Sequence, residues 1–536
     1  MLEQLRELRD RKGYDVSAII ATGDGKLGKK LEQEGIPFRC FDFDFPSMKG
    51  WSSLLSRVIE LARLLRHERY DVVQTHLFAS MVLGRLAAWL ADVPVRFAMI
   101  AGPYHLEAHT PRWIDRATWW METGLIASCE YTRTLYTQMG VPRARISRIY
   151  YGPDATKFDH SATQQYDLKR EYALPPESQV VAMVAYFYPR LPVSSWTPLF
   201  LHDRANKRQE DLIRAAPLIL RDKPDVRILL VGSGWTEAGE QEAAKAKQLA
   251  TDLNLGDRVI FAGYRNDVNS ILSSVDVAVQ ASLSENLGGT IEALLMECPI
   301  VATRTGGLVD SVRDGETGVL VEPLDPQDLA RGVLRVLKDP ADARRMATNG
   351  RRLMLEAFTL DRTVEALDCL YLRELAKAHR GYRWSVSSVR AIIALPVFAR
   401  LALQLAWDMK YQALWTSGWR PFPFLQLQAV ARKLRAAIGR GRAKIRRLTD
   451  RATSEIRGKQ DATSLLVSTI PRTAACIRST CIRLWTDALL RTRTVTAWLR
   501  LQPLYAYGYV RYLLRNTALL GRWDVFFAWI RGRKPL

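Results

Sequence analysis

Residues 276–303 read DVAVQASLSENLGGTIEALLMECPIVAT, and this stretch decides the fold. Its apolar beginning predicts a buried strand, the glycine pair Gly288-Gly289 predicts a turn, and Thr290–Cys298 has the pattern of a helix. Pro299 then opens another short apolar run, which predicts the next strand. A strand, a glycine turn, a helix and a second strand form a βαβ unit, so the sheet is expected to be parallel.

The same stretch contains a candidate binding site. Glu285 and Glu292 flank the glycine pair. Backbone N–H groups at the start of a helix attract anions, and a carboxylate beside them can accept hydrogen bonds from sugar hydroxyls. The pattern therefore predicts a ligand that carries both a phosphate and a polyol. A simpler interpretation is that Glu292 only stabilises the first turn of the helix.

Length and composition indicate a multidomain globular protein. A chain of 536 residues is too long for one core, so two or three domains are expected. Its six cysteines have neither zinc-type nor CxxC spacing, and a disulfide framework is not expected in so large a chain. The charged first residues do not read as a signal peptide. We therefore expect a cytoplasmic protein.

Charge divides the chain into two parts. Residues 381–536 hold 28 Lys and Arg against 6 Asp and Glu, a net charge of +22, whereas the remaining 380 residues sum to −1. This tail also has 8 of the 15 tryptophans. We predict that 381–536 is a basic, Trp- and Arg-rich, mostly helical extension of a near-neutral body.

Residues 1–168 are expected to form a first Rossmann-like domain, because predicted strands alternate with predicted helices. The predicted strands begin near Asp15, Phe38, Asp71, Val95, Leu125 and Ile146. The chain opens on a predicted helix, Leu2–Lys12, and not on the strand and glycine-rich turn with which such a domain normally begins. The first domain is therefore expected to lack its N-terminal strand.

Three polar residues of this domain follow predicted strands, where doubly wound sheets bind ligands. For His76 a structural role is preferred. Asp154 after Gly152-Pro153 fits a turn or a ligand contact equally well. For His105, which follows a strand and a Gly-Pro loop, a functional role is preferred.

Residues 169–380 are expected to form a second parallel α/β domain with a closing helix. Residues 191–206 form a loop rich in Pro, Ser and Trp that is long for a compact domain. Lys207 follows it at the start of a predicted helix. The glycines in Gly232-Ser-Gly234 and Gly306-Gly307 fit either ordinary turns or close approach to a ligand.

The motifs VGSG, FAGYRNDV, SLSENLGGTIEALLMECPIVATRTGG and GETGVLVEPLDPQDLA occur in this order and together resemble the retaining glycosyltransferases of family 4. The resemblance extends over residues 1 to about 376. It implies an α/β protein of GT-B fold, in which two Rossmann-like domains face each other across a cleft. It further implies an enzyme of hexosyltransferase type that binds a nucleotide-sugar donor mainly on the second domain and the acceptor on the first.

The resemblance also implies roles for individual residues. Three are implied to act near the reacting groups: Lys207 on the diphosphate, Glu285 and His105 on the donor sugar. Glu292 matches the glutamate that holds the ribose, although the spacing here is E-x6-E where the family has E-x7-E. The other donor-binding candidates are Gly288, Gly289, Thr290, Gly232 and an arginine partner of Lys207, either Arg190 or Arg204.

No cofactor or metal is expected beyond the nucleotide sugar. The segment Asp42-Phe43-Asp44 matches an Asp-x-Asp metal motif only by chance, because it falls on a predicted first-domain strand. We expect metal-independent, front-face transfer in which the leaving phosphate accepts the acceptor's proton. The acceptor is expected to be a membrane-associated glycan or lipid of surface polysaccharide or glycolipid synthesis.

Alternatives remain open for both the body and the tail. The body fits a non-catalytic GT-B-shaped binding or scaffold protein, or a sugar-nucleotide epimerase or phosphorylase, less well than a transferase. For 381–536 we prefer peripheral docking on an anionic membrane surface at the inner face of the plasma membrane. Nucleic-acid binding is less favoured because no binding motif is visible, and a partner-binding or poorly ordered extension is the third interpretation.

Overall fold

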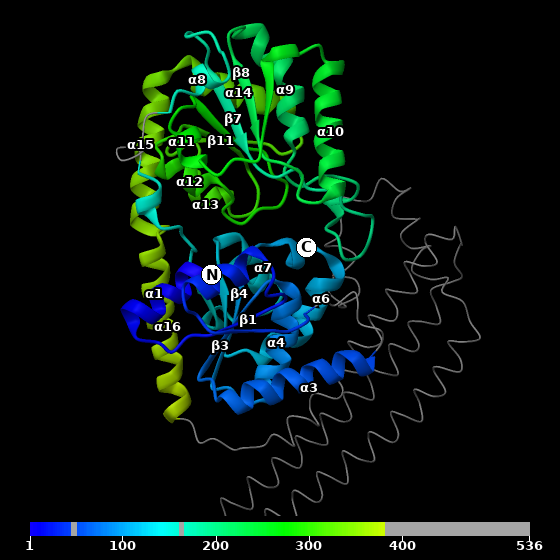
Figure 1. Cartoon of the computed structure of the whole chain (residues 1–536), viewed down its shortest axis with the longest axis vertical. Helices are drawn as coiled ribbons and strands as arrows, with labels where there is room; N and C mark the ends of the chain where they lie inside the picture. Colours follow the sequence, from blue (N-terminus) through cyan, green and yellow to red (C-terminus); the bar gives the residue numbers. More distant parts are fainter. Residues whose placement is uncertain (44–50, 160–165, 381–536) are drawn as a thin grey trace, which may run out of the picture. The chain divides into compact units, whose positions relative to one another are not determined.

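The computed structural model describes residues 1–43, 51–159 and 166–380, all within one compact unit (Figure 1). The predictions for 381–536, including its membrane or nucleic-acid partners, concern residues outside these ranges. Among the described helices, none is long and apolar enough to cross a bilayer.

The first domain carries its parallel strands in two separate sheets. β1 (Ala18–Ile20) pairs with β2 (Phe38–Cys40). The second sheet has the order β3-β4-β5-β6. Its strands are β3 (Val72–His76), β4 (Val95–Ile100), β5 (Gly124–Ala127) and β6 (Ile146–Arg148).

The division of the sheet has a simple topological reason. In the usual order 3-2-1-4-5-6, the first strand lies between the second and the fourth. If β1 and β2 are the second and third strands, that position falls between β1 and β3, and no described residue forms a strand there. A side-chain contact joins the two sheets instead: the hydroxyls of Ser17, just before β1, and of Tyr70, just before β3, lie 2.8 Å apart. The described strands of the first domain therefore form two sheets and not one continuous sheet.

Helices alternate with these strands along the chain, as expected for an α/β domain. The predicted opening helix is α1 (Leu2–Lys12). The remaining helices of the first domain are α2 (Lys26–Gln33), α3 (Trp51–Glu68), α4 (Phe78–Leu90), α5 (Tyr104–Glu107), α6 (His109–Thr118) and α7 (Glu130–Gln138).

The second domain has one six-stranded parallel sheet in the order β12-β11-β10-β7-β8-β9. Its strands are β7 (Val180–Val184), β8 (Arg227–Val231), β9 (Val259–Gly263), β10 (Val277–Gln280), β11 (Ile300–Thr303) and β12 (Val319–Val321). The stretch 276–303 supplies β10 and β11, and β10 pairs with both β7 and β11. Every residue of β10 and β11 is buried, as expected for a parallel sheet covered on both faces.

The helices of this domain include those predicted after Lys207, from Thr290 and at its close. They are α8 (Leu168–Glu171), α9 (Gln209–Asp222), α10 (Glu237–Asp252), α11 (Val268–Leu272), α12 (Thr290–Leu295), α13 (Leu308–Ser311), α14 (Pro326–Lys338), α15 (Pro340–Ala357) and α16 (Leu360–Arg380). The helix predicted over Thr290–Cys298 ends earlier, because Glu297 adopts a positive φ of 52°. The predicted loop 191–206 contains only the short 3-10 turn Leu199–Leu201.

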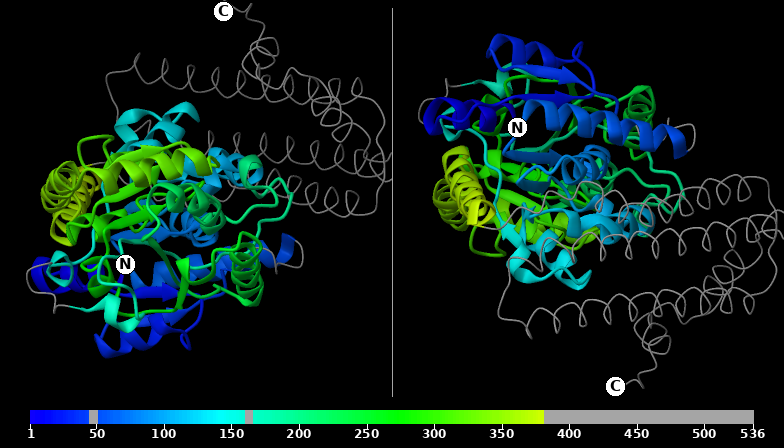
Figure 2. Two further views of the ribbon diagram at one scale, coloured as in Figure 1. Left: turned by 90° about the horizontal axis from the view of Figure 1, so that it is seen from above. Right: turned by 90° about the horizontal axis from the view of Figure 1, so that it is seen from below.

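The last described helix returns to the first domain. Val364, Leu367 and Leu370 of α16 belong to the same apolar cluster as Val95 and Phe97 of β4. Figures 1 and 2 show α16 beside α1, where Lys12 and Asp368 form an ion pair at 3.4 Å. The closing helix assigned to the second domain therefore packs into the core of the first.

A buried ion cluster ties α4 to α6 inside the first domain. Arg85 has no exposed surface, and its guanidinium donates to Asp115 at 2.6 Å and to Glu122 at 3.0 Å. Burial alone would raise the pKa of Asp115, but Arg85 holds that pKa at about 2. Burial raises the pKa of Glu122. One cation thus serves two buried carboxyl groups.

Replacing Arg85 by Met should destabilise the first domain by about 3–5 kcal/mol at neutral pH, because buried carboxylates would lose their cation. In the wild type, Asp115 has a lower pKa in the folded protein than its ordinary value of 3.8. It therefore stabilises the fold at pH values above 3.8, and this stabilisation is lost as the pH falls towards 2. In the variant, burial should raise the pKa of Asp115, so the carboxyl group takes up a proton as the pH falls from about 7 to about 5. The difference in the free energy of unfolding between the variant and the wild type should therefore become smaller over this range.

Denaturant unfolding followed by circular dichroism at several pH values measures this effect. Arg63→Met, on an exposed position of α3, is the matched control and should leave stability almost unchanged. Equal stability of the Arg85→Met variant and this control would contradict the assigned role of the cluster.

Candidate functional site

A cavity of about 540 Å³ opens at the carboxyl ends of β7, β8, β9 and β10 in the second domain. Its volume is in the range of small-molecule sites, and its place is where parallel sheets bind ligands. Four of the predicted site residues line this large cavity: Lys207, Gly232, Gly289 and Glu292. The structure therefore brings together residues that are up to 85 positions apart in the chain.

Lys207 and Glu285 form an ion pair beside the large cavity. Both side chains are largely buried, with 16% and 15% of their surfaces exposed. Glu285 also accepts hydrogen bonds from the Ser282 hydroxyl at 3.2 Å and from the Asn286 backbone N–H at 3.3 Å. The ammonium group of Lys207 additionally lies 6.0 Å from the centre of the Tyr188 ring. This lysine is held in place by its surroundings and is not a free surface residue.

Glu292 presents a carboxylate without a complete set of partners. Its Oε2 atom is buried, and no described residue donates a hydrogen bond to it. Burial raises the pKa of this carboxyl group, and the neighbouring Glu285 raises it further. A buried acceptor without a donor is costly unless a ligand supplies one. The position on the cavity wall makes Glu292 a candidate acceptor for ligand hydroxyl groups.

Glycines allow the Glu285 loop to pack closely on the following loop. Gly306 has a φ of 51°, and a Cβ atom there would lie 2.0 Å from the Glu285 carbonyl oxygen. The backbone N–H of Gly307 donates to that same oxygen at 3.1 Å. Gly288 also adopts a positive φ, 57°. Gly306-Gly307 is therefore more than a turn, because it supports the backbone that carries Glu285.

Gly232 and Thr290 differ in which of their atoms a ligand could contact. Gly232 follows β8 with a φ of 142°, and a Cβ atom there would lie 2.2 Å from the Ala185 carbonyl oxygen. The side chain of Thr290 is buried and bonded to the Ser311 hydroxyl at 2.7 Å, so only its backbone is available to a ligand. The helix that it begins has just six residues, so we assign no anion site to its N-terminus.

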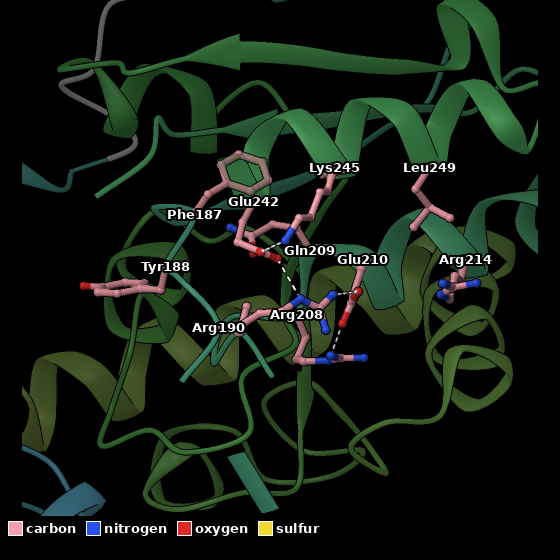
Figure 3. A pocket seen from close by; sticks show the side chains of 12 residues that line it. Phe187, Tyr188, Arg190, Arg208, Gln209, Glu210, Arg214, Glu242, Lys245 and Leu249 are labelled. Carbon is pink, nitrogen blue, oxygen red and sulfur yellow. Dashed lines mark hydrogen bonds and ion pairs between the residues drawn. The ribbon is translucent and has the colours of Figure 1, made fainter. Parts of the chain in front are cut away.

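Neither candidate arginine lines the large cavity. Arg190 lines a separate, smaller cavity of about 190 Å³, where it is paired with Glu242 at 3.0 Å and Glu210 at 3.1 Å (Figure 3). Arg204 donates to the carbonyl oxygen of Phe200 at 2.8 Å. Either arginine would have to leave these partners to meet a diphosphate beside Lys207.

His105 lies on α5 of the first domain and is buried, with 8% of its surface exposed. Its Nε2 atom is 3.5 Å from both the Tyr136 hydroxyl and the Asp115 carboxylate. Its ring lies 5.5 Å from that of Phe78. His105 is not among the residues that line the large cavity, so the structure does not bring it directly against Glu292.

Hydrogen bonds connect the helix of His105 to the loop of Glu285. Ser284, next to Glu285, donates to the carboxylate of Glu107 at 2.5 Å. Glu107 accepts a second bond from Tyr131 at 3.0 Å. Nearby, the backbone N–H of Glu130 donates to Asp310 of the second domain at 2.7 Å. The predicted first-domain and second-domain residues are therefore mechanically connected.

His76 and Asp154, the other two polar residues predicted after strands of the first domain, are hydrogen-bonded within that domain. His76 is bonded to the Gln74 amide at 3.0 Å, and burial lowers the pKa of its imidazole to about 4. Asp154 accepts the backbone N–H of Thr156 at 3.1 Å and so caps the 3-10 turn Ala155–Lys157. Both side chains thus have structural hydrogen bonds.

Sequence reasoning overlooked the aromatic wall of the large cavity. The rings of Tyr186 and Tyr264 stack 6.1 Å apart, and both line the cavity with Arg265. Lys26, from α2 of the first domain, lies 5.2 Å from the centre of the Tyr264 ring. Tyr264 and Arg265 belong to the FAGYRNDV motif, so their position after β9 was the available signal.

Comparison with known families identifies both domains. Residues 1–152 match the glycosyl transferase 4-like domain, and residues 200–353 match the glycosyl transferases group 1. The first match contains β1 to β6 of the first domain, and the second match contains β8 to β12 of the six-stranded sheet.

The alignments with relatives of known name cover most of the length of those relatives. The chain is 28% identical to the UDP-Gal:alpha-D-GlcNAc-diphosphoundecaprenol alpha-1,3-galactosyltransferase of Escherichia coli, over 68% of this chain and 91% of that protein. It is 26% identical to the 2-deoxystreptamine glucosyltransferase of Streptomyces kanamyceticus, over 60% of this chain and 83% of that protein.

Solved structures support the fold. The crystal structure of Anabaena Alr3699/HepE in complex with UDP aligns with a TM-score of 0.56 at 20% identity, over 69% of this chain and 94% of that one. A glycosyltransferase from Rickettsia africae aligns with a TM-score of 0.58 at 18% identity, over 70% and 93%. Two matched domains, a cavity at the carboxyl edge of the second sheet and this architecture agree: the chain belongs to the group 1, family 4 glycosyltransferases of GT-B fold.

Proposed function

We propose that this glycosyltransferase transfers a sugar from a nucleoside-diphosphate sugar to a membrane-associated glycan or lipid, in surface polysaccharide or glycolipid synthesis. The transfer retains the anomeric configuration and needs no metal. The observation that carries the proposal is the combination, at one cavity, of the Lys207–Glu285 ion pair and the buried, unpartnered carboxylate oxygen of Glu292. Relatives support the substrate classes, since one is named for a UDP-galactose donor and a diphosphoundecaprenol acceptor.

Different residues bind the different chemical groups of the donor. The Glu292 carboxylate accepts hydrogen bonds from the ribose hydroxyls, which completes its missing partners. The nucleobase packs on the tyrosine wall formed by Tyr186 and Tyr264, because planar rings stack favourably. Gly232 and Gly289 let the backbone approach the diphosphate and the sugar. Glu285 and His105 bind the hydroxyl groups of the donor sugar.

Lys207 stabilises the leaving group. Negative charge grows on the β-phosphate as the bond between the anomeric carbon and the phosphate oxygen breaks. A fixed ammonium group in a partly buried site stabilises this charge more in the transition state than in the ground state. Arg190 or Arg204 is the proposed second cation, which requires the chosen arginine to exchange its present partners for the diphosphate.

The transfer itself balances without an enzyme nucleophile. The acceptor oxygen forms its bond to the anomeric carbon on the face that the phosphate leaves, which preserves the configuration. The electron pair of the broken bond stays on the phosphate oxygen, and the acceptor's proton moves to that oxygen. The products are the glycosylated acceptor and a nucleoside diphosphate.

Lys207→Met should lower kcat/KM by about 10²–10³, as loss of one fixed transition-state partner typically does. Glu292→Gln should mainly raise the KM for the donor, by about tenfold or more, because hydrogen bonds to a charged acceptor are lost. Release of nucleoside diphosphate from a panel of sugar nucleotides, with and without acceptor, measures both. Lys30→Met on an exposed position of α2 is the matched control.

Unchanged turnover in both cavity variants would refute this site assignment. Product analysis separates the alternatives: an epimerase returns an isomerised sugar nucleotide without releasing nucleoside diphosphate, and a scaffold protein changes no substrate.

Removing divalent metals should leave turnover unchanged, because a lysine and not a metal ion neutralises the leaving diphosphate. The test is transfer activity in excess EDTA, followed by addition of Mg²⁺ or Mn²⁺. Activity that falls in EDTA and returns with either ion would overturn metal independence.

The basic tail should place the enzyme on its acceptor's membrane. The full chain should co-sediment with vesicles containing phosphatidylglycerol, and less so as salt rises, because screening weakens attraction to anionic lipid. Replacing the Lys and Arg residues within 429–447 by Gln should reduce binding, and phosphatidylcholine vesicles serve as the uncharged control. Salt-independent binding that is equal in both proteins would argue against this role.

A further inference from the structure

The segment between β7 and α9 is folded and fixed, although it is long and nearly free of regular structure. The ring of His202 donates to the carbonyl oxygens of Ser194 at 3.1 Å and Thr197 at 3.2 Å. The base of the segment is closed by the backbone N–H of Leu191, which donates to Arg204 at 3.1 Å. The 191–206 segment therefore presents its middle residues in a defined arrangement.

Those middle residues contact the first domain. The backbone N–H and the hydroxyl of Thr110 each bond to Ser195, both at 2.9 Å. Thr197 is hydrogen-bonded to Tyr104. A part of the donor domain is thus attached to the helices that begin at the carboxyl edge of the first sheet, on either side of His105.

Trp196, between these two attachment points, leads towards His105. The Trp196 ring meets the Phe78 ring edge-on at 6.3 Å, and the Phe78 ring also lies 5.5 Å from that of His105. Trp196 is only half-buried, and its indole Nε1–H has no acceptor among the described residues. It therefore offers an apolar face and an unused hydrogen-bond donor together.

These two properties match one class of ligand. A pyranose ring has an apolar face of C–H groups, which packs on an aromatic ring, and a rim of hydroxyls, which accept hydrogen bonds from an indole N–H. Trp196 does not line the large cavity, and its ring contacts Phe78 of the first domain. Its place suits a sugar other than the donor.

We propose that Trp196 binds the pyranose ring of the acceptor, and that the 191–206 segment determines acceptor specificity. The inference rests on the proposed function, because it takes His105 to lie at the donor sugar. An acceptor oxygen has to come within about 3–3.5 Å of the anomeric carbon. The acceptor's ring must then lie beside the donor sugar, and Trp196 is separated from His105 by one aromatic ring.

Saturation-transfer difference NMR on the full chain tests this. The probes are the methyl α-pyranosides of glucose, galactose and N-acetylglucosamine, each with and without a nucleoside diphosphate, with UDP, GDP, dTDP and ADP tried in turn. The wild type should transfer saturation to ring protons of at least one pyranoside. Trp196→Ala should weaken that binding by about tenfold, and Trp196→Phe should weaken it less, because it keeps an aromatic face.

Leu199→Ala is the matched control, since this side chain of the same segment is 66% exposed. It should bind pyranosides like the wild type, and all three variants should keep wild-type affinity for the nucleoside diphosphate by calorimetry. Absence of pyranoside binding in the wild type, or equal binding in Trp196→Ala, would overturn the proposal. So would a parallel loss of nucleotide affinity, because Trp196 would then organise the donor site. Failure of every nucleoside diphosphate to bind the wild type would instead refute the proposed function, and the pyranoside signals would still report on Trp196.

Discussion

The loop that carries Glu285 is the point on which the site depends, because three parts of the chain meet there. The carboxylate of Glu285 pairs with Lys207 at the start of α9, and its carbonyl oxygen accepts the N–H of Gly307 from the loop after β11. The adjacent Ser284 bonds to Glu107 of the first domain. Any side chain at Gly306 would collide with the same carbonyl, so the packing of this loop requires glycine. One short loop thus fixes the position of the cation, of the carboxylate and of the contact between domains.

Buried charge organises the first domain in a different manner. Arg85 and its two carboxyl partners lie within the core, and Asp115 of this cluster is also a neighbour of His105. Removing such groups from water is costly, so each charge must keep its partner. His105 therefore lies against groups whose positions are fixed by strong mutual attraction.

Two segments of the chain connect the two domains through side-chain contacts. The 191–206 segment reaches from the second domain to Thr110, and α16 packs on β4 of the first. The segment contacts α6, and helix α16 contacts β4. Both come from parts of the chain that local sequence pattern would assign to the second domain alone. Function at a site between two sheets depends on such crossings, because the donor and the acceptor must meet within bonding distance.

Local pattern determined most of the architecture. Apolar runs and glycine turns predicted nearly every described strand, because parallel strands must be buried on both faces and helices must follow them. The motif order also indicated which carboxylate and which lysine line the cavity, since Lys207 and Glu292 occupy it. Tertiary structure alone decided the rest. Arg190 pairs with Glu210 and Glu242, which come from two different helices, and so lies away from Lys207. Partners of Arg85, His105 and Trp196 are likewise distant in sequence, and the free energy of an ion pair or a ring contact depends on distance in space, which residue spacing does not encode.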